Sequence, residues 1–334
     1  MNTCFARTLF LCLMLLPVAA KADYQNKSFR VYGAAGIQYV NYSERLKNYA
    51  GMEVESDFDS LNFVQRSGGY NAVGEHLGFY IRTASTLISR EDEEEWLATG
   101  HNGPVQLDTA AMNFNGIDVI LIRHFKTGFY AGGGMHYQKV AFSRFNWRSS
   151  SATEAFADDI ESYVLNDPAQ VESIQNRIDN SSLVDSAGNP ITTLEEYMAA
   201  IRFKPEESLD VVFEDASSFS AIVGGGYDSY FIDKKEGLRY VGALYVGTQL
   251  YEHVLNSSSE VSIDRTFGGG YDLQGEFGVG YQFNPKIGLM LMLTGNYSYR
   301  PEIRERLNST QTISLPENTF YAYASYLSVS WNFK

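Results

Sequence analysis

The chain has 334 residues with a formal net charge of −14, and 14% of its residues are aromatic. The excess of 40 acidic over 26 basic residues argues against a nucleic-acid partner, because nucleic-acid binding depends on a basic surface. The 23 tyrosines, 21 phenylalanines and 29 glycines are typical of twisted β-strands. After the N-terminal segment, no stretch is long and apolar enough for a membrane-spanning helix.

Residues 1–22 predict a cleavable secretory signal peptide. Arg7 precedes an apolar run at residues 9–20, and Ala22 ends the segment at a predicted cleavage site. Such a signal directs export through the Sec pathway and leaves residues 23–334 as the mature protein. Both cysteines lie inside the signal, so the mature chain is expected to have no disulfide and no cysteine-bound metal.

Alternation of apolar and polar side chains predicts β-strands along most of the mature chain. In the first of them, Phe29, Val31 and Ile37 alternate with Arg30 and Gln38, which is the two-residue period of a strand. The same alternation predicts strands at residues 28–42, 54–65, 73–89, 112–125, 129–145, 218–232, 238–254, 266–283, 287–300 and 319–333.

Polar and glycine-rich segments predict the connections between these strands. Residues 43–52 predict a loop, and the Ser-Gly-Gly-Tyr-Asn sequence at 67–71 predicts a turn. Residues 90–103 predict an acidic connector in which Asp92 and the carboxylates of Glu93 to Glu95 are solvated.

The lengths of the connections alternate along the chain. Short ones are predicted at residues 126–128, 233–237 and 284–286, and long ones at 90–110, 146–215, 255–265 and 301–318. Regular alternation of short and long connections is typical of an up-and-down barrel, in which an even number of strands keeps both termini on one side. We therefore predict about ten strands, with eight or twelve as alternatives.

Residues 150–215 interrupt the strand pattern. Residues 151–154 and 193–196 both have the spacing of a helix capping box, and Asp167-Pro168 is a typical helix start. Acidic residues in this insertion far outnumber its basic residues, which are Arg177, Arg202 and Lys204. The sequence predicts an acidic insertion with two or three short helices, either as an outward-facing loop or as a plug that pairs with Arg30, Arg82 and Arg239.

The last predicted strand, Thr319–Phe333, has one apolar aromatic face and one small polar face. Leu327, Val329, Trp331 and Phe333 share the apolar face. This strand resembles the C-terminal strand of the small β-barrel proteins of the Gram-negative outer membrane, in which the apolar face meets lipid.

The resemblance implies an all-β protein, a transmembrane antiparallel up-and-down barrel, located in the bacterial outer membrane. It implies contact with outer-membrane lipid and lipopolysaccharide, and recognition of Trp331 and Phe333 by the barrel-assembly machinery. It also implies that the long connections face outward and the short turns face the periplasm. No cofactor or dedicated metal site is expected.

Charged residues on the polar faces of the predicted strands are expected to line the lumen as a network of paired charges, because unpaired buried charges are costly. The expected members of the network are Arg30, His76, Arg82, Asp118, His136, Asp228, Arg239, Asp272 and Glu276.

The expected function is a non-enzymatic structural or surface-interaction role. One alternative is a narrow porin-like channel for small hydrophilic solutes, through the same charged lumen. A less favoured alternative is a lipid hydrolase or protease at the outer rim, for which Glu252, His253 and Ser257 are the only candidate Ser–His–acid set. Their spacing does not match a hydrolase pattern, so the chain is expected not to be an enzyme.

The acidic insertion is the expected contact for a partner. Asp158, Asp159 and Glu161 supply oxygen ligands, but the sequence lacks the loop pattern of a dedicated calcium site. The expected partners are therefore divalent cations that bridge lipopolysaccharide, or a cationic molecule.

Overall fold

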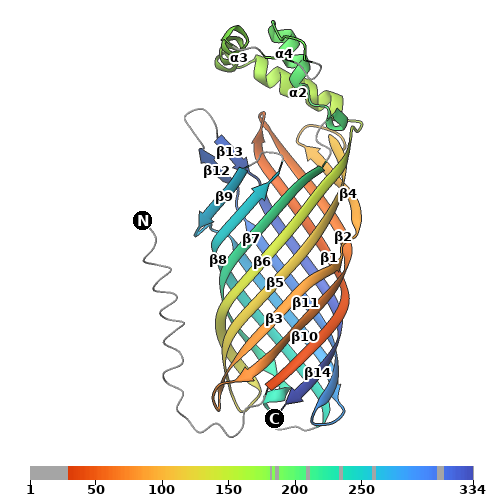
Figure 1. Ribbon diagram of the computed structural model, residues 1–334, viewed down its shortest axis with the longest axis vertical. Coiled ribbons are helices and arrows are strands. Elements are labelled where there is room, and N and C mark those ends of the chain that lie inside the picture. Colours follow the sequence, from red (N-terminus) through yellow and green to blue (C-terminus); the bar gives the residue numbers. More distant parts are fainter. Residues whose placement is uncertain are drawn as a thin grey trace.

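The computed structural model shows an antiparallel sheet that closes on itself as a barrel (Figure 1). It describes residues 29–180, 183–184, 188–207, 211–232, 236–257, 261–306 and 312–333. The predicted signal peptide lies outside these residues. In the described part of the chain, no helix has both the length and the apolar character needed to cross a bilayer.

The barrel wall has ten antiparallel spans, as predicted from the sequence. Strands β3 and β4 both lie between β2 and β5 and together form one span, and β9 and β10 together form another beside β8. The strands of the wall are β1 (Phe29–Tyr49), β2 (Met52–Ala72), β3 (Leu77–Ile88), β4 (Glu91–Ala98), β5 (Gln106–His124), β6 (Phe129–Arg148), β7 (Val211–Asp228), β8 (Gly237–Asn256), β9 (Val261–Thr266), β10 (Tyr271–Gln282), β11 (Ile287–Arg300) and β14 (Glu317–Phe333).

The first and last strands join to close the barrel. β1 pairs with β14 from Phe29 opposite Phe333 to Arg45 opposite Glu317 without a register shift. On its other edge, β1 pairs with β2. We call the end of the barrel where β1 begins and β14 finishes the terminal end, and the opposite end the helical end.

The outer face of the wall is apolar over a band next to the terminal end. Leu327 and Leu291 are each 57% exposed, although leucine side chains are usually buried in a water-soluble protein. Aromatic rings border the band on both sides, as in the contact of Phe29 with Phe333 at the terminal end and of Tyr137 with Phe219 farther up. Apolar side chains that face outward between two aromatic girdles are the pattern of a barrel surrounded by lipid.

Several strands are longer than predicted. β1 and β2 continue to a tight turn at Ala50 and Gly51, so the predicted loop at 43–52 is wrong. The predicted turn at 67–71 is also wrong, because β2 runs on to Ala72. Its Gly68 and Gly69 are packed against neighbouring backbone: a Cβ on Gly68 would lie 2.5 Å from the Ile81 carbonyl oxygen. These glycines allow close strand packing and do not make a turn.

The predicted acidic connector at 90–103 contains strand β4. Successive side chains of β4 face opposite sides of the wall, so Glu93 points outward to Arg148 while Glu94 points into the barrel. Glu94 is fully buried. The prediction that all of these carboxylates are solvated is therefore wrong for Glu94.

Three α-helices and a 3-10 helix lie between β6 and β7, beyond the rim of the helical end (Figure 1). They are α2 (Thr153–Leu165), α3 (Pro168–Asn180), α4 (Leu194–Ile201) and η1 (Pro205–Glu207). The capping box of α4 forms as predicted between Thr193 and Glu196, whereas α2 starts at Ala152 without a side-chain cap. Helices α2, α3, α4 and η1 lie outside the lumen, so the described part of the insertion does not form the predicted plug.

Helix α2 is fixed to the rim by apolar packing. Phe156 packs in a cluster with Val54, Ala98 and Val105 from the rim. The Thr153 hydroxyl donates a hydrogen bond of 2.6 Å to the carbonyl of Val105. A separate hairpin, β12 (Ile303–Arg306) with β13 (Thr312–Leu315), connects β11 to β14 at the same end and packs against β8 and β9.

Candidate functional site

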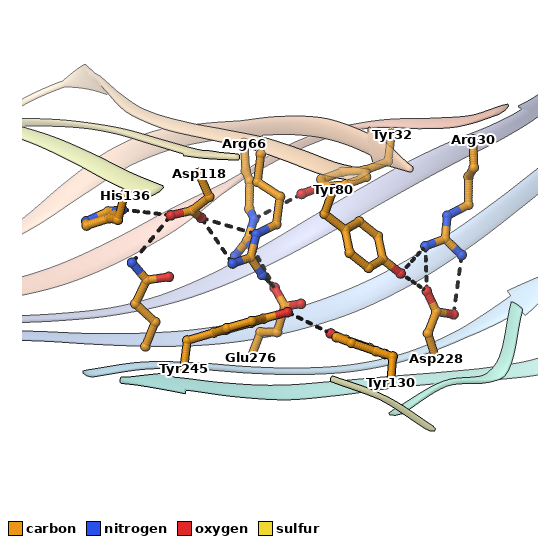
Figure 2. A network of polar contacts seen from close by, with 12 residues as sticks. Arg30, Tyr32, Arg66, Tyr80, Asp118, Tyr130, His136, Asp228, Tyr245 and Glu276 are labelled. Carbon is orange, nitrogen blue, oxygen red and sulfur yellow. Dashed lines mark hydrogen bonds and ion pairs between the residues drawn. The ribbon is translucent and has the colours of Figure 1, made fainter. Parts of the chain in front are cut away.

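The polar groups nearest the terminal end of the lumen gather around Asp228, the last residue of β7. Its carboxylate accepts a hydrogen bond of 2.5 Å from Arg30 Nη2 and another from the Tyr80 hydroxyl (Figure 2). It also accepts 2.8 Å from the backbone N–H of Tyr230. Asp228 is buried, and both of its carboxylate oxygens have hydrogen-bond partners.

The terminal end of the lumen is closed by a short 3-10 helix, η2 (Ser229–Phe231). The Phe231 ring stacks on His124 with 4.4 Å between ring centroids and also contacts Tyr70. The Tyr230 ring lies between two guanidinium groups, with Arg30 at 4.1 Å and Arg239 at 4.6 Å from its centroid. The prediction of a strand through residue 232 is wrong, because the Asp228 carboxylate caps this inward turn.

A second group of charges lies in the middle of the lumen (Figure 2). Asp118 accepts a hydrogen bond of 3.1 Å from Arg82 Nε and contacts His136 Nδ1 at 2.7 Å. Glu276 bonds Arg82 Nη1 at 3.0 Å and Arg66 Nη2 at 2.5 Å. Two arginines thus meet two carboxylates, which balances charge inside the wall.

The structure brings most of the predicted network together but not all of it. Arg239 is buried and donates to the Ser229 carbonyl at 3.2 Å, and Asp272 accepts from the Ser220 hydroxyl. The prediction that His76 lines the lumen is wrong, because His76 lies in the turn before β3 and its side chain is 41% exposed. Arg66 belongs to the network but was not predicted, because the predicted second strand ended at residue 65, before the predicted turn at 67–71.

Above the charges, the lumen is filled by an apolar layer. The layer combines side chains from β1, β2, β5, β6 and β14, and its rings touch: Phe114 and Phe320 are 5.6 Å apart, and Phe58 and Phe142 are 5.2 Å apart. Its buried members are Val40, Tyr42, Phe58, Ala110, Met112, Phe114, Val140, Phe142, Phe320 and Ala322. On each strand these residues lie farther from the terminal end than the charged groups.

A third polar layer lies beyond the apolar one, at the helical end. Arg144 bonds Glu94 at 2.6 Å and Glu44 at 2.8 Å, and all three are buried. Asp108 is directly opposite Glu94 in the sheet and accepts 2.9 Å from the Trp96 indole N–H. Burial and the neighbouring Glu94 raise the pKa of Asp108 to about 8, which favours the protonated form of this carboxyl.

Two small cavities lie among the described residues of the lumen. One of about 30 Å³ lies among Arg66, Arg82 and His136. Another of about 50 Å³ lies between Arg30 and Glu276. Cavities of this size in polar surroundings hold one or a few water molecules.

The structure separates the candidate Ser–His–acid set of the outer rim. Glu252 points into the barrel toward Arg300 at 3.4 Å, whereas His253, the next residue, points outward to Asp264 at 3.0 Å. The Ser257 hydroxyl accepts a hydrogen bond of 2.8 Å from the Phe213 backbone N–H. Glu252 and His253 lie on opposite faces of the wall, so these three residues do not form one site.

The predicted assembly residues lie at the end of β14. Trp331 faces outward, and the Phe333 ring contacts Phe29 across the closing seam at 6.0 Å. Recognition of Trp331 and Phe333 by the assembly machinery stays a prediction.

No protein-family model matches this chain, and no curated protein matches it. Among solved structures, it is similar to the outer-membrane protease OmpT from Escherichia coli, with a TM-score of 0.52 and 8% identity over 93% of this chain and 98% of that chain. The fold is that of a Gram-negative outer-membrane β-barrel. At 8% identity the comparison with OmpT shows the fold alone, and the outward apolar band agrees with a barrel located in the outer membrane.

Two further solved structures are similar to this chain at lower TM-scores. The translocator domain of the autotransporter NalP from Neisseria meningitidis has a TM-score of 0.34 and 10% identity, over 99% of this chain and 98% of that chain. OprG from Pseudomonas aeruginosa has a TM-score of 0.33 and 8% identity, over 92% of this chain and 96% of that chain.

Proposed function

We propose that this outer-membrane barrel does not conduct solutes and that it has a structural or surface-interaction role exerted from its helical end. The filled lumen is the observation that supports this proposal most. The aromatic helix η2, the paired charges and the apolar layer follow one another along the inside of the barrel.

Opening the lumen would break several of these contacts at once. Arg82 bonds both Asp118 and Glu276, so moving it aside would leave two buried carboxylates uncompensated. Removing one partner of a buried ion pair costs about 3–5 kcal/mol. The apolar layer adds a second barrier, because its buried rings exclude water and ions from the same passage.

The fold shared with a protease does not favour proteolysis here. A protease needs catalytic groups that a peptide can reach. The close carboxyl pair at the helical end, Glu94 and Asp108, is fully buried and engaged by Arg144 and Trp96. A peptide has no access to it.

The acidic insertion is the part of the proposed surface role that has a definable chemistry. Arg202 already bonds Glu154, Asp158 and Glu161, at 2.8, 2.7 and 3.2 Å. Within the described ranges, no set of three or more His, Cys, Asp or Glu side chains is placed to hold a metal ion. The acidic surface therefore suits a diffuse cationic partner, or divalent cations that bridge lipopolysaccharide, better than a dedicated metal site.

Planar-bilayer recording tests the closed lumen. The purified protein, checked for folding by its heat-dependent migration in gels, is expected to give no unitary currents, and Arg82→Ala is expected to stay silent because the apolar layer persists. Stable unitary currents in the wild-type protein, altered by Arg82→Ala or Asp228→Ala, would overturn the proposal in favour of the porin-like channel.

A further inference from the structure

A row of four polar side chains crosses the outer wall of the barrel on β6, β7, β8 and β9. Lys139 lies opposite Ser217, Ser217 lies opposite His253, and His253 lies opposite Asp264. All four face outward, because the alternate residues Ala216, Val254 and Ile263 pack together inside the barrel. The register thus places a serine, a histidine and an aspartate side by side on three adjacent strands.

The strand register gives the row the order of a Ser–His–Asp site, and its histidine and aspartate are in contact. His253 Nδ1 lies 3.0 Å from Asp264 Oδ1, and the Tyr251 hydroxyl donates to the same carboxylate. A carboxylate at Nδ1 fixes the ring and stabilises its protonated form, which is the role of the acid in a catalytic triad. Asp264 on β9 and Ser217 on β7 lie on opposite sides of His253 in the sheet, and with Nδ1 bonded to Asp264, Nε2 is the ring nitrogen left for Ser217.

Ser217 is placed to act as the nucleophile. Directly opposite residues of an antiparallel pair have Cβ atoms about 4.5–5.5 Å apart, so its hydroxyl is within side-chain reach of the His253 ring. No described residue forms a hydrogen bond with the Ser217 hydroxyl, which leaves it able to rotate toward Nε2. Contacts between nucleophile and base are often long before substrate binds.

The position of the row on the wall points to its substrate. The next outward row toward the terminal end consists of Tyr137, Phe219 and Tyr251, which lie opposite one another on β6, β7 and β8. These rings belong to the upper aromatic girdle, which marks the interface between hydrocarbon and headgroups. A group directly above the girdle meets the headgroup region, where the ester bonds of membrane lipids lie. His253 and Asp264 are accessible there, with side chains 36% and 62% exposed.

We propose that Ser217, His253 and Asp264 form a catalytic site on the outer wall that hydrolyses acyl esters of membrane lipids. Ser217 Oγ attacks the ester carbonyl carbon while His253 Nε2 accepts its proton, and the tetrahedral intermediate breaks the carbon–oxygen bond of the ester. The protonated His253 gives its proton to the leaving alcohol. Water then attacks the acyl-serine, and the products are a fatty acid and the free Ser217 hydroxyl.

Lys139 completes the site with positive charge beside the nucleophile. Its ammonium is held by Asp215, two residues before Ser217 on the same face of β7, with 2.8 Å between Nζ and Oδ2. Both groups are partly exposed, so the ammonium can move to a carbonyl oxygen that gains negative charge during attack. This site departs from the expectation that the chain is not an enzyme, and it does not involve the lumen.

Hydrolysis assays on two lipid classes test the proposal. The folded protein in mixed micelles is incubated separately with acyl-labelled phosphatidylethanolamine and acyl-labelled lipid A. Release of labelled fatty acid from the first identifies a phospholipid ester as substrate, and release from the second identifies a lipid A ester. Ser217→Ala and His253→Ala are expected to reduce the rate at least about 100-fold, since both take part in proton transfer to and from the reacting groups.

Two controls make the result decisive. Ser257→Ala, which changes a nearby serine whose hydroxyl already accepts a backbone hydrogen bond, is expected to keep full activity. A fluorophosphonate probe is expected to label Ser217 in the wild-type protein and not in His253→Ala, as read by peptide mass. No release from either lipid, release that survives Ser217→Ala, or absence of labelling at Ser217 would overturn the proposal.

Discussion

At the scale of single residues, β6 carries two arginines that make similar ion pairs on opposite sides of the wall. Arg144 points inward to Glu44 and Glu94, with side chains at most 5% exposed. Arg148 points outward to Glu93 at 2.7 Å, with both side chains 49% exposed. Comparing substitutions of Arg144 and Arg148 therefore separates the effect of burial on stability from the effect of residue type.

Arg144→Met is expected to lower the free energy of unfolding by about 3–5 kcal/mol, because it leaves two buried carboxylates without a cation. The matched control Arg148→Met is expected to change it by about 0–1 kcal/mol, since an exposed ion pair is weak. Urea unfolding of both variants in detergent micelles, followed by circular dichroism, measures the difference. Equal losses would contradict the buried network.

Asp108 gives a pH dependence of stability with a definite sign. Its pKa is raised in the folded state by burial and by Glu94, so the folded chain binds a proton that the unfolded chain releases at lower pH. Stability from this group therefore falls as pH rises from about 4 to about 8. Asp108→Asn is expected to stabilise the protein more at pH 9 than at pH 5, by urea unfolding. Asp59→Asn, an exposed outward position, should show no such difference.

The charged residues of the lumen nearest the terminal end were predictable because they lie on the polar face of an alternating strand, whereas the buried Glu44, Glu94 and Arg144 of the helical end were not. Arg30, Arg82, Asp118 and Asp228 are examples, and the structure adds only their partners. The row of Ser217, His253 and Asp264 was not predictable. These residues are far apart in the sequence and meet through strand register, which one sequence does not reveal.

At the scale of elements, the strands extend well beyond the part that crosses the membrane. A transmembrane strand needs about 9–11 residues, whereas β1 and β2 each have 21. In the extension the outer face meets water and the inner face contains ion pairs such as that of Glu94, so the apolar period disappears. This is why residues 43–49 and 91–98 resemble loops in the sequence although they form strands.

Helix α2 depends on Phe156 for its position on the rim. Phe156→Ala is expected to release the helical insertion while the barrel stays folded, because the lost packing belongs to the rim cluster and not to the wall. Limited proteolysis should then cleave between β6 and β7 faster than in wild type, with unchanged heat-dependent migration of the barrel. Leu165→Ala, at an exposed position of the same helix, is the control and should cleave at the wild-type rate.

At the scale of the whole molecule, the barrel and the insertion are separable. β6 and β7 pair up to Phe145 opposite Val211, so a short linker can replace residues 150–207 without disturbing the wall. The deleted protein is expected to assemble and to remain silent in bilayers, but to lose binding of a cationic peptide such as polylysine to whole cells. Unchanged binding after deletion would contradict the proposed role of the acidic insertion.

The seam between β1 and β14 has a consequence for biogenesis. The backbone hydrogen bonds between β1 and β14 can form only after the last strand has been synthesised, because residues 29–45 pair with residues 333–317. A chain that lacks β14 would have two unpaired sheet edges, and unpaired edges can pair with strands of other chains. Fragments released before synthesis is complete should therefore depend on periplasmic chaperones or be degraded, and only the full-length polypeptide can become a self-contained cylinder.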